Sequence, residues 1–262
     1  MKLTIGRYWI NTVVVLLCFA AGILFCVTQP HPDPPKLSKS REECLRDLAR
    51  YSKILEENPN DVGALIDRAW TYGRLQMYKN DIADCCRALV LEPSRAVAYA
   101  ERSYAYSRIG HYDEALLDID KAIATDPFNS AFLAKRASVY NCMGDYLKAA
   151  EDCDASIKMD ASYSVAYFHR GWAYISMGRE DEALADYSKA IELKPDDAAS
   201  HFNRGLIYGD RRLWDKAKED FEAALRIEPD DLAAKSRLEF VKSKVTFIKP
   251  LKPSEYYRGS ED

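Results

Sequence analysis

Apolar and small residues recur along this chain with a period of 34 positions between residues 62 and 231. In each 34-residue window, a small residue is followed three positions later by a tyrosine, and alanines recur at two positions of the second half. The small residues are Ala69, Ser103, Ala137, Gly171 and Gly205, and the tyrosines are Tyr72, Tyr106, Tyr140, Tyr174 and Tyr208. Because three- and four-residue spacings put side chains on one face of a helix, we expect two amphipathic helices per window. In the first window these helices are predicted over 63–75 and 79–91, and the others follow at 34-residue intervals.

Prolines follow the same period. They stand at Pro59, Pro93, Pro127, Pro195 and Pro229, and Ala161 occupies the one position of this series without proline. A proline inside a helix lacks the N–H of a backbone hydrogen bond and clashes with the preceding turn. We therefore expect these residues to lie between helices, which predicts a stack of helical hairpins.

The small residue, the tyrosine, the two alanine columns and the closing proline together resemble the tetratricopeptide repeat (TPR) family. The resemblance implies an all-α fold, a right-handed superhelical solenoid of antiparallel helix hairpins. Three departures stand out: the early tryptophan of the family pattern is missing, arginine replaces the leucine that follows it, and Asp81 stands where alanine is expected. The repeats expected from the alignment are 62–95, 96–129, 130–163, 164–197 and 198–231.

Further segments flank the five repeats. Residues 40–61 keep the register of a second helix alone, and residues 232–245 predict a polar capping helix of the kind that solenoid ends require. Residues 29–39 are rich in proline and predict a stiff spacer after the N-terminal segment, and residues 246–262 form a tail.

Residues 9–28 carry no charge, and twenty residues are enough for a helix to cross a membrane. Residues 1–8 before them contain Lys2 and Arg7. The apolar run is longer than that of most signal peptides, so we expect an uncleaved single-pass anchor, with a cleaved signal peptide as the alternative. The early charges favour the repeats on the non-cytoplasmic side, periplasmic, lumenal or extracellular. Lys36 and Lys39 favour the reverse orientation.

Charge and cysteine content add limits. The net charge of −4 provides no broad basic surface for nucleic acid. The cysteines beyond residue 28 are Cys44, Cys85, Cys86, Cys142 and Cys153, without a C-x-x-C motif. We expect buried thiols. The disulfide to check first is Cys142 with Cys153, on the two helices of one repeat, although their unequal distances from the intervening turn argue against it.

Arginine and aspartate recur sixteen residues apart in every repeat. The pairs are Arg68 with Asp84, Arg102 with Asp118, Arg136 with Asp152, Arg170 with Asp186, and Arg204 with Asp220. Antiparallel helices joined by a turn about midway bring such residues to the same height. We therefore expect five structural ion pairs within the repeats.

Catalysis is not expected. The sequence has no Gly-rich phosphate loop, H-E-x-x-H or G-x-S-x-G motif. Of the four histidines, His169 falls in an exposed column and His201 in an interior one, and both are interpreted as structural. We expect no cofactor and no metal.

The resemblance implies that the first helix of each repeat lines a concave groove for a peptide or partner helix. The groove residues expected from it are Asp67, Trp70, Glu101, Tyr104, Lys135, His169, Trp172 and Asn203. The lysine and asparagine clamp that some family members use for acidic C-termini is missing here. We expect a mixed groove, acidic toward its N-terminal end, that prefers apolar or basic segments there.

These observations predict a membrane-tethered TPR scaffold that binds partner proteins. Two alternatives stay open: a cytosol-facing organelle receptor of inverted topology, and a secreted or lipid-tethered subunit that self-assembles. The sequence identifies neither the partner nor the oligomeric state.

Overall fold

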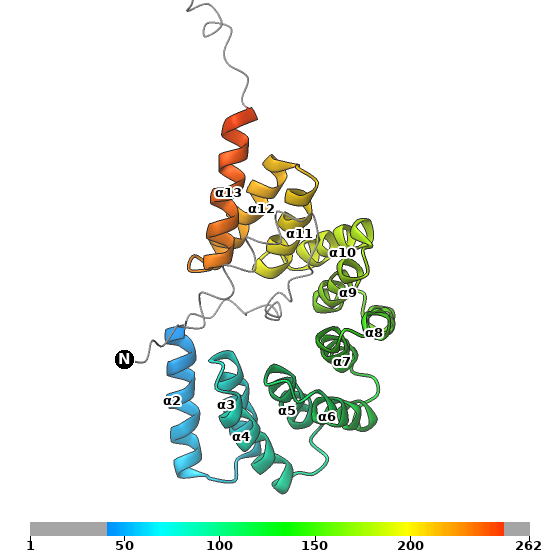
Figure 1. Cartoon of the computed structure of the whole chain (residues 1–262). Coiled ribbons are helices and arrows are strands. Elements are labelled where there is room, and N and C mark those ends of the chain that lie inside the picture. The colour runs from blue at the N-terminus through cyan, green and yellow to red at the C-terminus, as the bar shows by residue number, and fades with distance from the viewer. Residues whose placement is uncertain (1–40, 249–262) are drawn as a thin grey trace, which may run out of the picture. The chain divides into compact units, whose positions relative to one another are not determined.

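The computed structural model describes residues 41–248, which fold into twelve helices joined by short turns (Figure 1). The helices before the first hairpin and in the first two repeats are α2 (Arg41–Glu57), α3 (Val62–Arg74), α4 (Tyr78–Leu91), α5 (Ala96–Arg108) and α6 (Tyr112–Thr125). The remaining ones are α7 (Ser130–Met143), α8 (Tyr146–Met159), α9 (Ser164–Ser176), α10 (Glu180–Leu193), α11 (Ala198–Asp210), α12 (Trp214–Ile227) and α13 (Leu232–Ile248). The helices of the first repeat lie within one residue of the predicted bounds.

Consecutive helices pack as hairpins, and each hairpin packs on the next. In addition, α3 contacts α5, α5 contacts α7, and α7 contacts α9. The first helices of the first four repeats therefore form a continuous layer on the inner side of the curve, with α4, α6, α8 and α10 outside them (Figure 1). The five prolines of the 34-residue series lie in the loops between helices, as predicted.

Small residues let the two helices of a hairpin approach closely. A Cβ added to Gly171 would lie 3.1 Å from the ring of Tyr187, and one added to Gly205 would lie 3.0 Å from the ring of Phe221. The position of these rings is filled in the other repeats by the smaller residues Cys85, Ile119 and Cys153, all fully buried. A large aromatic ring on the second helix of a hairpin is thus accommodated by a glycine on the first helix.

The turn inside each hairpin contains one residue of left-handed backbone at the same repeat position. Glycine occupies it three times, with φ of 84° at Gly110, 84° at Gly144 and 76° at Gly178. Gln76 and Arg212 adopt φ of 62° and 57° there. Side chains other than glycine adopt this conformation at a cost, so two of the five turns are locally strained.

The flanking helices cover the ends of the stack. Leu55 of α2 belongs to the same hydrophobic cluster as Leu65 of α3. At the other end, Leu238 and Val241 of α13 pack with Phe221 of α12. α13 runs to Ile248, three residues beyond the predicted 232–245.

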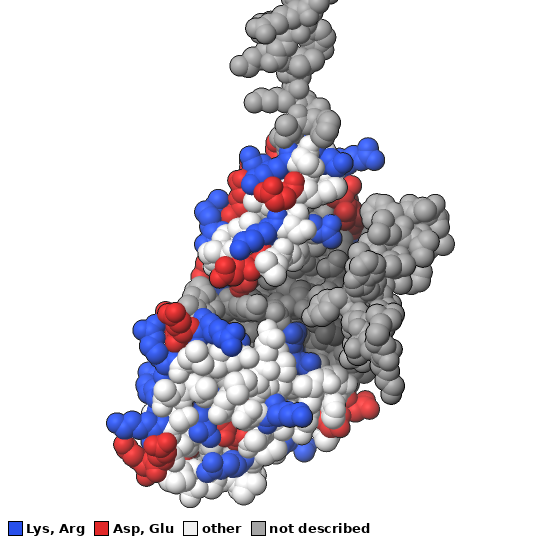
Figure 2. All heavy atoms as spheres, turned by 60° about the vertical axis from the view of Figure 1, so that its left-hand side comes forward, with Lys and Arg blue, Asp and Glu red and all other residues white. Residues whose placement is uncertain are grey.

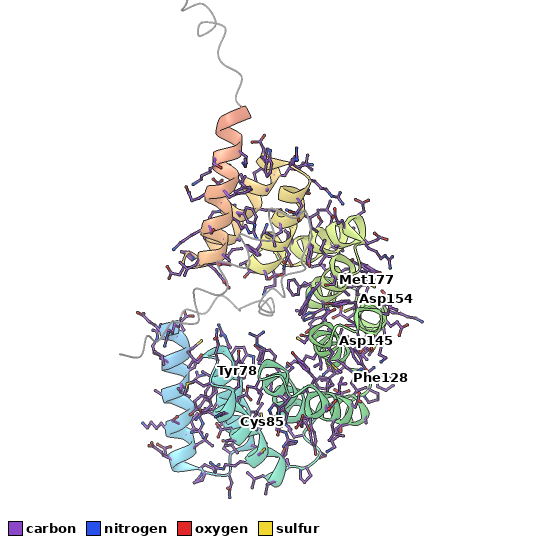
Figure 3. All side chains as sticks on the ribbon, viewed as in Figure 1. Tyr78, Cys85, Phe128, Asp145, Asp154 and Met177 are labelled. Atoms are coloured by element: carbon purple, nitrogen blue, oxygen red, sulfur yellow. The ribbon has the colours of Figure 1, made fainter. Side chains whose placement is uncertain are left out.

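All five described cysteines are free thiols, so Cys142 and Cys153 form no disulfide. Cys85 lies in the interior of the first repeat (Figure 3). Burial raises the pKa of Cys142 to about 11, which keeps this thiol protonated near neutral pH.

The expected membrane segment, residues 9–28, and the expected spacer, residues 29–39, lie outside the described residues. None of the helices α2 to α13 is both long enough and apolar enough to cross a membrane.

Candidate functional site

Side chains from α3, α5, α7 and α9 line a groove on the inner layer of helices. Further lining residues come from α2, from the turn after α3 and from loops of the later repeats. The lining comprises Arg41, Cys44, Trp70, Gly73, Arg74, Leu75, Gln76, Tyr78, Glu101, Ser103, Tyr104, Ser107, Lys135, Ser138, Val139, Tyr163, Val165, His169, Lys194 and Asp230. Tyr78, at the start of α4, lies at the inner side of the curve (Figure 3). One groove therefore collects residues from four successive first helices.

Five of the eight expected groove residues line this groove: Trp70, Glu101, Tyr104, Lys135 and His169. The other three, Asp67, Trp172 and Asn203, lie outside its lining. Asp67 is exposed to solvent, and the amide of Asn203 donates to the carbonyl of Ala199 within its own helix. The ring of Trp172 lies 6.4 Å from that of His169, which is part of the lining.

His169 is buried, whereas its column was predicted to be exposed. Its exposed fraction is 3%, and it packs edge-on against Phe168. Burial lowers the pKa of His169 to about 4, so the imidazole is neutral at physiological pH. Asn141 of α7 donates to the carbonyl of His169 at 2.9 Å. The prediction was wrong because α9 packs against α7 of the preceding repeat, a contact that a single repeat considered alone does not contain.

Glu101 and Lys135 form an ion pair across α5 and α7. The ammonium of Lys135 lies 2.5 Å from Oε1 of Glu101, and the Glu101 side chain is almost entirely buried. The charge of Glu101 is thereby compensated within the protein. Four of the lining residues are basic and two are acidic: Arg41, Arg74, Lys135 and Lys194 against Glu101 and Asp230. The lining therefore lacks the acidic N-terminal end that the sequence predicts.

Aromatic and basic side chains meet at the N-terminal end of the groove. The guanidinium of Arg74 lies 4.8 Å from the centre of the Trp70 ring, one helical turn away on α3. Tyr104 of α5 contacts Tyr78 edge-on, with 6.3 Å between the ring centres. Such amphipathic rings can contact apolar and charged parts of a ligand alike.

Asp81 of α4 is a buried acid directly behind this end of the groove. Its side chain is fully buried; Oδ1 accepts a hydrogen bond from the thiol of Cys85, and Oδ2 has no partner among the described residues. Burial, reinforced by the negative charge of Glu101, raises the pKa of Asp81 to about 8. The sequence reveals Asp81 as a departure from the repeat pattern, but not its proximity to Glu101.

The Arg and Asp residues sixteen positions apart are joined in all five repeats. In each pair Nε and Nη2 of the arginine donate to the two carboxylate oxygens, at distances between 2.6 and 2.9 Å. This two-point geometry is the one that the sixteen-residue spacing predicts.

Each of these arginines also makes a hydrogen bond to the preceding helix hairpin or to α2, which the sequence pattern does not predict. The third donor, Nη1, of each arginine bonds to the residue sixteen positions before it, on the second helix of the preceding hairpin or on α2. These acceptors are Ser52, Cys86, Asp120, Asp154 and Ser188, at 2.6 to 3.5 Å. The recurrence of short polar residues in this column was the available signal.

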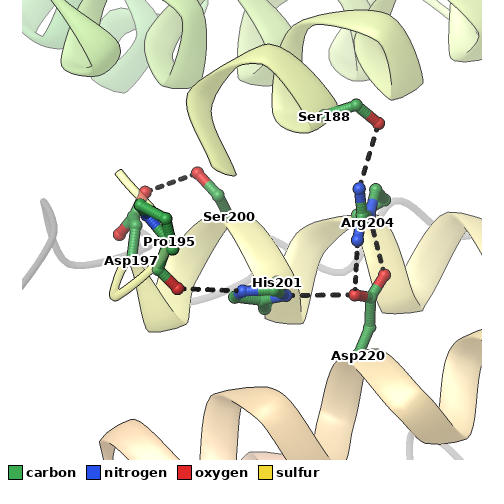
Figure 4. A network of polar contacts seen from close by, with 7 residues as sticks. All are labelled: Ser188, Pro195, Asp197, Ser200, His201, Arg204 and Asp220. Atoms are coloured by element: carbon green, nitrogen blue, oxygen red, sulfur yellow. Dashed lines mark hydrogen bonds and ion pairs between the residues drawn. The ribbon is translucent and has the colours of Figure 1, made fainter. Parts of the chain in front are cut away.

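His201 belongs to the last of these networks (Figure 4). Its Nδ1 lies 3.1 Å from Oδ1 of Asp220, and its Nε2 lies 3.2 Å from the carbonyl oxygen of Pro195. Asp220 also accepts hydrogen bonds from the guanidinium of Arg204, and Nη1 of Arg204 donates to the hydroxyl of Ser188 on α10. The interior position predicted for His201 agrees with these contacts.

Charged side chains of both signs are interspersed on the face that Figure 2 shows, without a large area of one sign. Within the described residues, no group of three or more His, Cys, Asp or Glu side chains is arranged to hold a metal ion.

Comparisons with known proteins bear on the fold. Models of the TPR repeat match residues 171–210, and models of the tetratricopeptide repeat match residues 100–164 and 198–231. A tetratricopeptide repeat protein from Parabacteroides merdae is 21% identical, with 77% of this chain and 78% of that chain covered and a TM-score of 0.68. A thermophilic TPR protein of Thermus thermophilus is 18% identical, with 70% of this chain and 99% of that chain covered and a TM-score of 0.64. A search of the curated proteins found no match.

These similarities and the repeated hairpins define the described residues as an all-helical repeat fold of the solenoid class. The segments that the models match, within residues 100–231, are therefore tetratricopeptide repeats, as the sequence predicts, and the fold of the described residues is that of TPR proteins.

Proposed function

We propose that this protein is a non-catalytic TPR scaffold that captures a segment of a partner protein in the groove lined by α3, α5, α7 and α9. One observation carries the proposal: Trp70, Tyr104 and the Glu101–Lys135 ion pair, from three successive first helices, face the same groove. Tryptophan and tyrosine dominate the binding energy of many protein interfaces. A groove that presents them beside a charged pair is suited to an extended or helical peptide.

The contrast between repeated and varied positions supports this assignment. The Arg and Asp pairs recur in all five repeats and join the helices. Groove positions instead differ between repeats. The same position holds Trp70 in the first repeat, Tyr104 in the second and Ser138 in the third. Each repeat therefore offers a ligand a different contact, as expected if a partner's side chains are read one after another along the groove.

Replacement of groove aromatics tests the proposal. The full chain carrying Trp70→Ala and Tyr104→Ala should lose the partner proteins that the unaltered chain captures, and its helical circular dichroism should be unchanged. Phe128→Ala is a matched control, because this ring is 88% exposed in the turn between two hairpins. Unchanged capture by the folded double variant would show that the groove is not the binding site.

Tethering to a membrane through residues 9–28 is a further part of the proposal, with the repeats on the non-cytoplasmic side. The length of the uncharged segment and the positions of Lys2 and Arg7 support it. A reporter enzyme fused after Asp262 distinguishes this topology from that of a cytosol-facing receptor, because it is active on only one side of the membrane.

The secreted, self-assembling alternative makes a different prediction. It requires mature chains that associate through their grooves, so the mass of the purified protein should rise with concentration. Light scattering that detects a monomer at all concentrations would exclude it.

A further inference from the structure

Asp81 differs from the residues at the equivalent position of the other repeats. Those residues are Ala115, Ala149, Ala183 and Ala217, and all five side chains are fully buried. Packing of this hairpin position therefore requires no more than a methyl group. A carboxyl group buried here costs free energy, because it loses its hydration. Its presence in the first repeat alone calls for a reason other than folding.

The unpartnered oxygen of Asp81 lies directly beneath the lining of the groove. A Cβ added to Gly73 would lie 2.8 Å from Oδ2 of Asp81 and 3.4 Å from the ring of Tyr104. Gly73 and Tyr104 both line the groove. On that side Oδ2 of Asp81 is covered by Gly73, the one lining residue of α3 that has no side chain.

The charges around Asp81 leave a negative excess. The groups that face it are Glu101 on α5, Lys135 on α7, and Cys85 and Asp84 on its own helix. Asp84 is neutralised by the guanidinium of Arg68. Once Asp81 is ionised, the ammonium of Lys135 is the one cation among these groups that compensates both Asp81 and Glu101. Another cation at the groove surface would balance the cluster.

We propose that Asp81 and Glu101 form a subsite for one basic side chain, lysine or arginine, of the segment that the groove captures. Glu101 contacts the ammonium or guanidinium group from the groove wall, and Asp81 supplies a second negative charge from beneath Gly73. Since the neighbouring Lys135 side chain is about one-third exposed, it can rotate toward solvent as the ligand cation approaches. This inference rests on the proposed function and names the chemistry of one ligand position.

The protonation of Asp81 gives the subsite a characteristic pH dependence. With a pKa of about 8, Asp81 is largely protonated at pH 7 in the free protein. A bound cation favours the ionised carboxylate, so binding lowers this pKa and releases a proton. Affinity for a basic side chain should therefore rise from pH 7 to pH 9, and affinity for an uncharged one should not.

The test uses the full chain labelled with ¹⁵N-glycine, whose eleven glycines include Gly73. The probes are the N-methylamides of N-acetyl-lysine and N-acetyl-arginine, and the controls are those of N-acetyl-norleucine and N-acetyl-glutamate. We expect a saturable shift of the Gly73 amide with the basic probes. At pH 9, where Asp81 is ionised, loss of one of the two negative charges should weaken their binding about tenfold in Asp81→Ala and in Glu101→Gln.

Asp81→Ala keeps this test independent of folding. It introduces the residue that the other four repeats carry at this position, so its melting temperature should equal or exceed that of the unaltered chain. Equal shifts with lysine and norleucine probes, or unchanged lysine binding in the folded Asp81→Ala variant, would overturn the inference. With either result, the aromatic groove variant can still lose partner capture. Failure of this inference is therefore distinguishable from failure of the proposed function.

Discussion

Arg170 joins two repeats through Asp154. Its Nη1 lies 2.6 Å from Oδ1 of Asp154 on the preceding hairpin, while Nε and Nη2 bind Asp186 within its own repeat. Asp154 is 57% exposed, whereas the side chain of Asp186 is almost fully buried. The two carboxylates should therefore contribute very differently to stability, although they bind the same guanidinium.

Arg170→Ala should lower the free energy of unfolding by about 3 kcal/mol, because it leaves the carboxylate of Asp186 buried without a partner. Asp154→Ala should cost less than about 1 kcal/mol, since its ion pair is exposed to water and salt. Urea unfolding followed by circular dichroism measures both values. Equal losses in the two variants would contradict the assignment of Asp186 as the principal partner.

The strained turns give a second prediction. Gln76→Gly should stabilise the protein by roughly 0.5 to 1 kcal/mol, because glycine adopts the positive φ at this position without steric cost. Gly144→Gln, at the equivalent turn of the third repeat, is the reverse change and should destabilise by a similar amount. Thermal unfolding of the two variants compares them directly. A loss of stability in Gln76→Gly would show that its side chain makes a contact worth more than the backbone strain.

The fit between Gly171 and Tyr187 gives a third prediction. Gly171→Ala places a methyl group 3.1 Å from the tyrosine ring and should destabilise by about 1 to 3 kcal/mol. Together with Tyr187→Ile, this change places a small side chain opposite isoleucine, as in the second repeat, where Ser103 opposes the buried Ile119. The double variant should therefore be more stable than the sum of the two single changes indicates. Strict additivity in this cycle would mean that the two side chains do not compete for the same space.

The sequence predicts the part of the structure that lies within one repeat. The 34-residue register places each hairpin, and the spacing of sixteen places Arg170 opposite Asp186, because both follow from helix geometry alone. Contacts between repeats depend on how far each hairpin turns relative to the last, and a single repeat pattern does not contain that angle. The burial of His169 and the bond from Arg170 to Asp154 are both contacts of this kind.

Candidate site residues divide in the same way. The family resemblance identifies the inner helix face, so Trp70, Tyr104 and Lys135 are found in the groove. The resemblance does not show which charged groove residues are paired with each other. Glu101 and Lys135 form an ion pair although they lie in different repeats, 34 residues apart. Nor does the resemblance separate Trp172, which lies outside the lining, from Trp70, which is part of it.

Asp81 gives a prediction for the pH dependence of stability. Its pKa is raised to about 8 in the folded protein, above the value of an unfolded aspartate near 4. The folded state therefore binds more protons than the unfolded state between these pH values. This group lowers stability progressively as pH rises from about 4 to 8, and its effect is constant above that range. Asp81→Ala should remove this contribution, so the variant gains most over the unaltered chain at pH 8.5 and least at pH 5. Urea unfolding at the two pH values measures the difference, and an equal gain at both would contradict the raised pKa.

The Glu101–Lys135 pair gives the last prediction. Lys135→Met removes the ammonium and leaves the buried carboxylate of Glu101 beside Asp81 without compensation, so it should destabilise by about 3 kcal/mol. Glu101→Gln removes the opposite charge, and the amide can still accept a hydrogen bond from Lys135. In the double variant no buried charge is left unpaired at these two positions, and the flexible apolar side chain of methionine can fill the space of the lysine stem. The double variant should therefore recover most of the stability lost in Lys135→Met. Because the inferred subsite uses the charge of Glu101, the same variant should bind the lysine probe about tenfold more weakly even though it is folded. A double variant as unstable as Lys135→Met alone would show that the lysine stabilises the groove through packing and not through its charge.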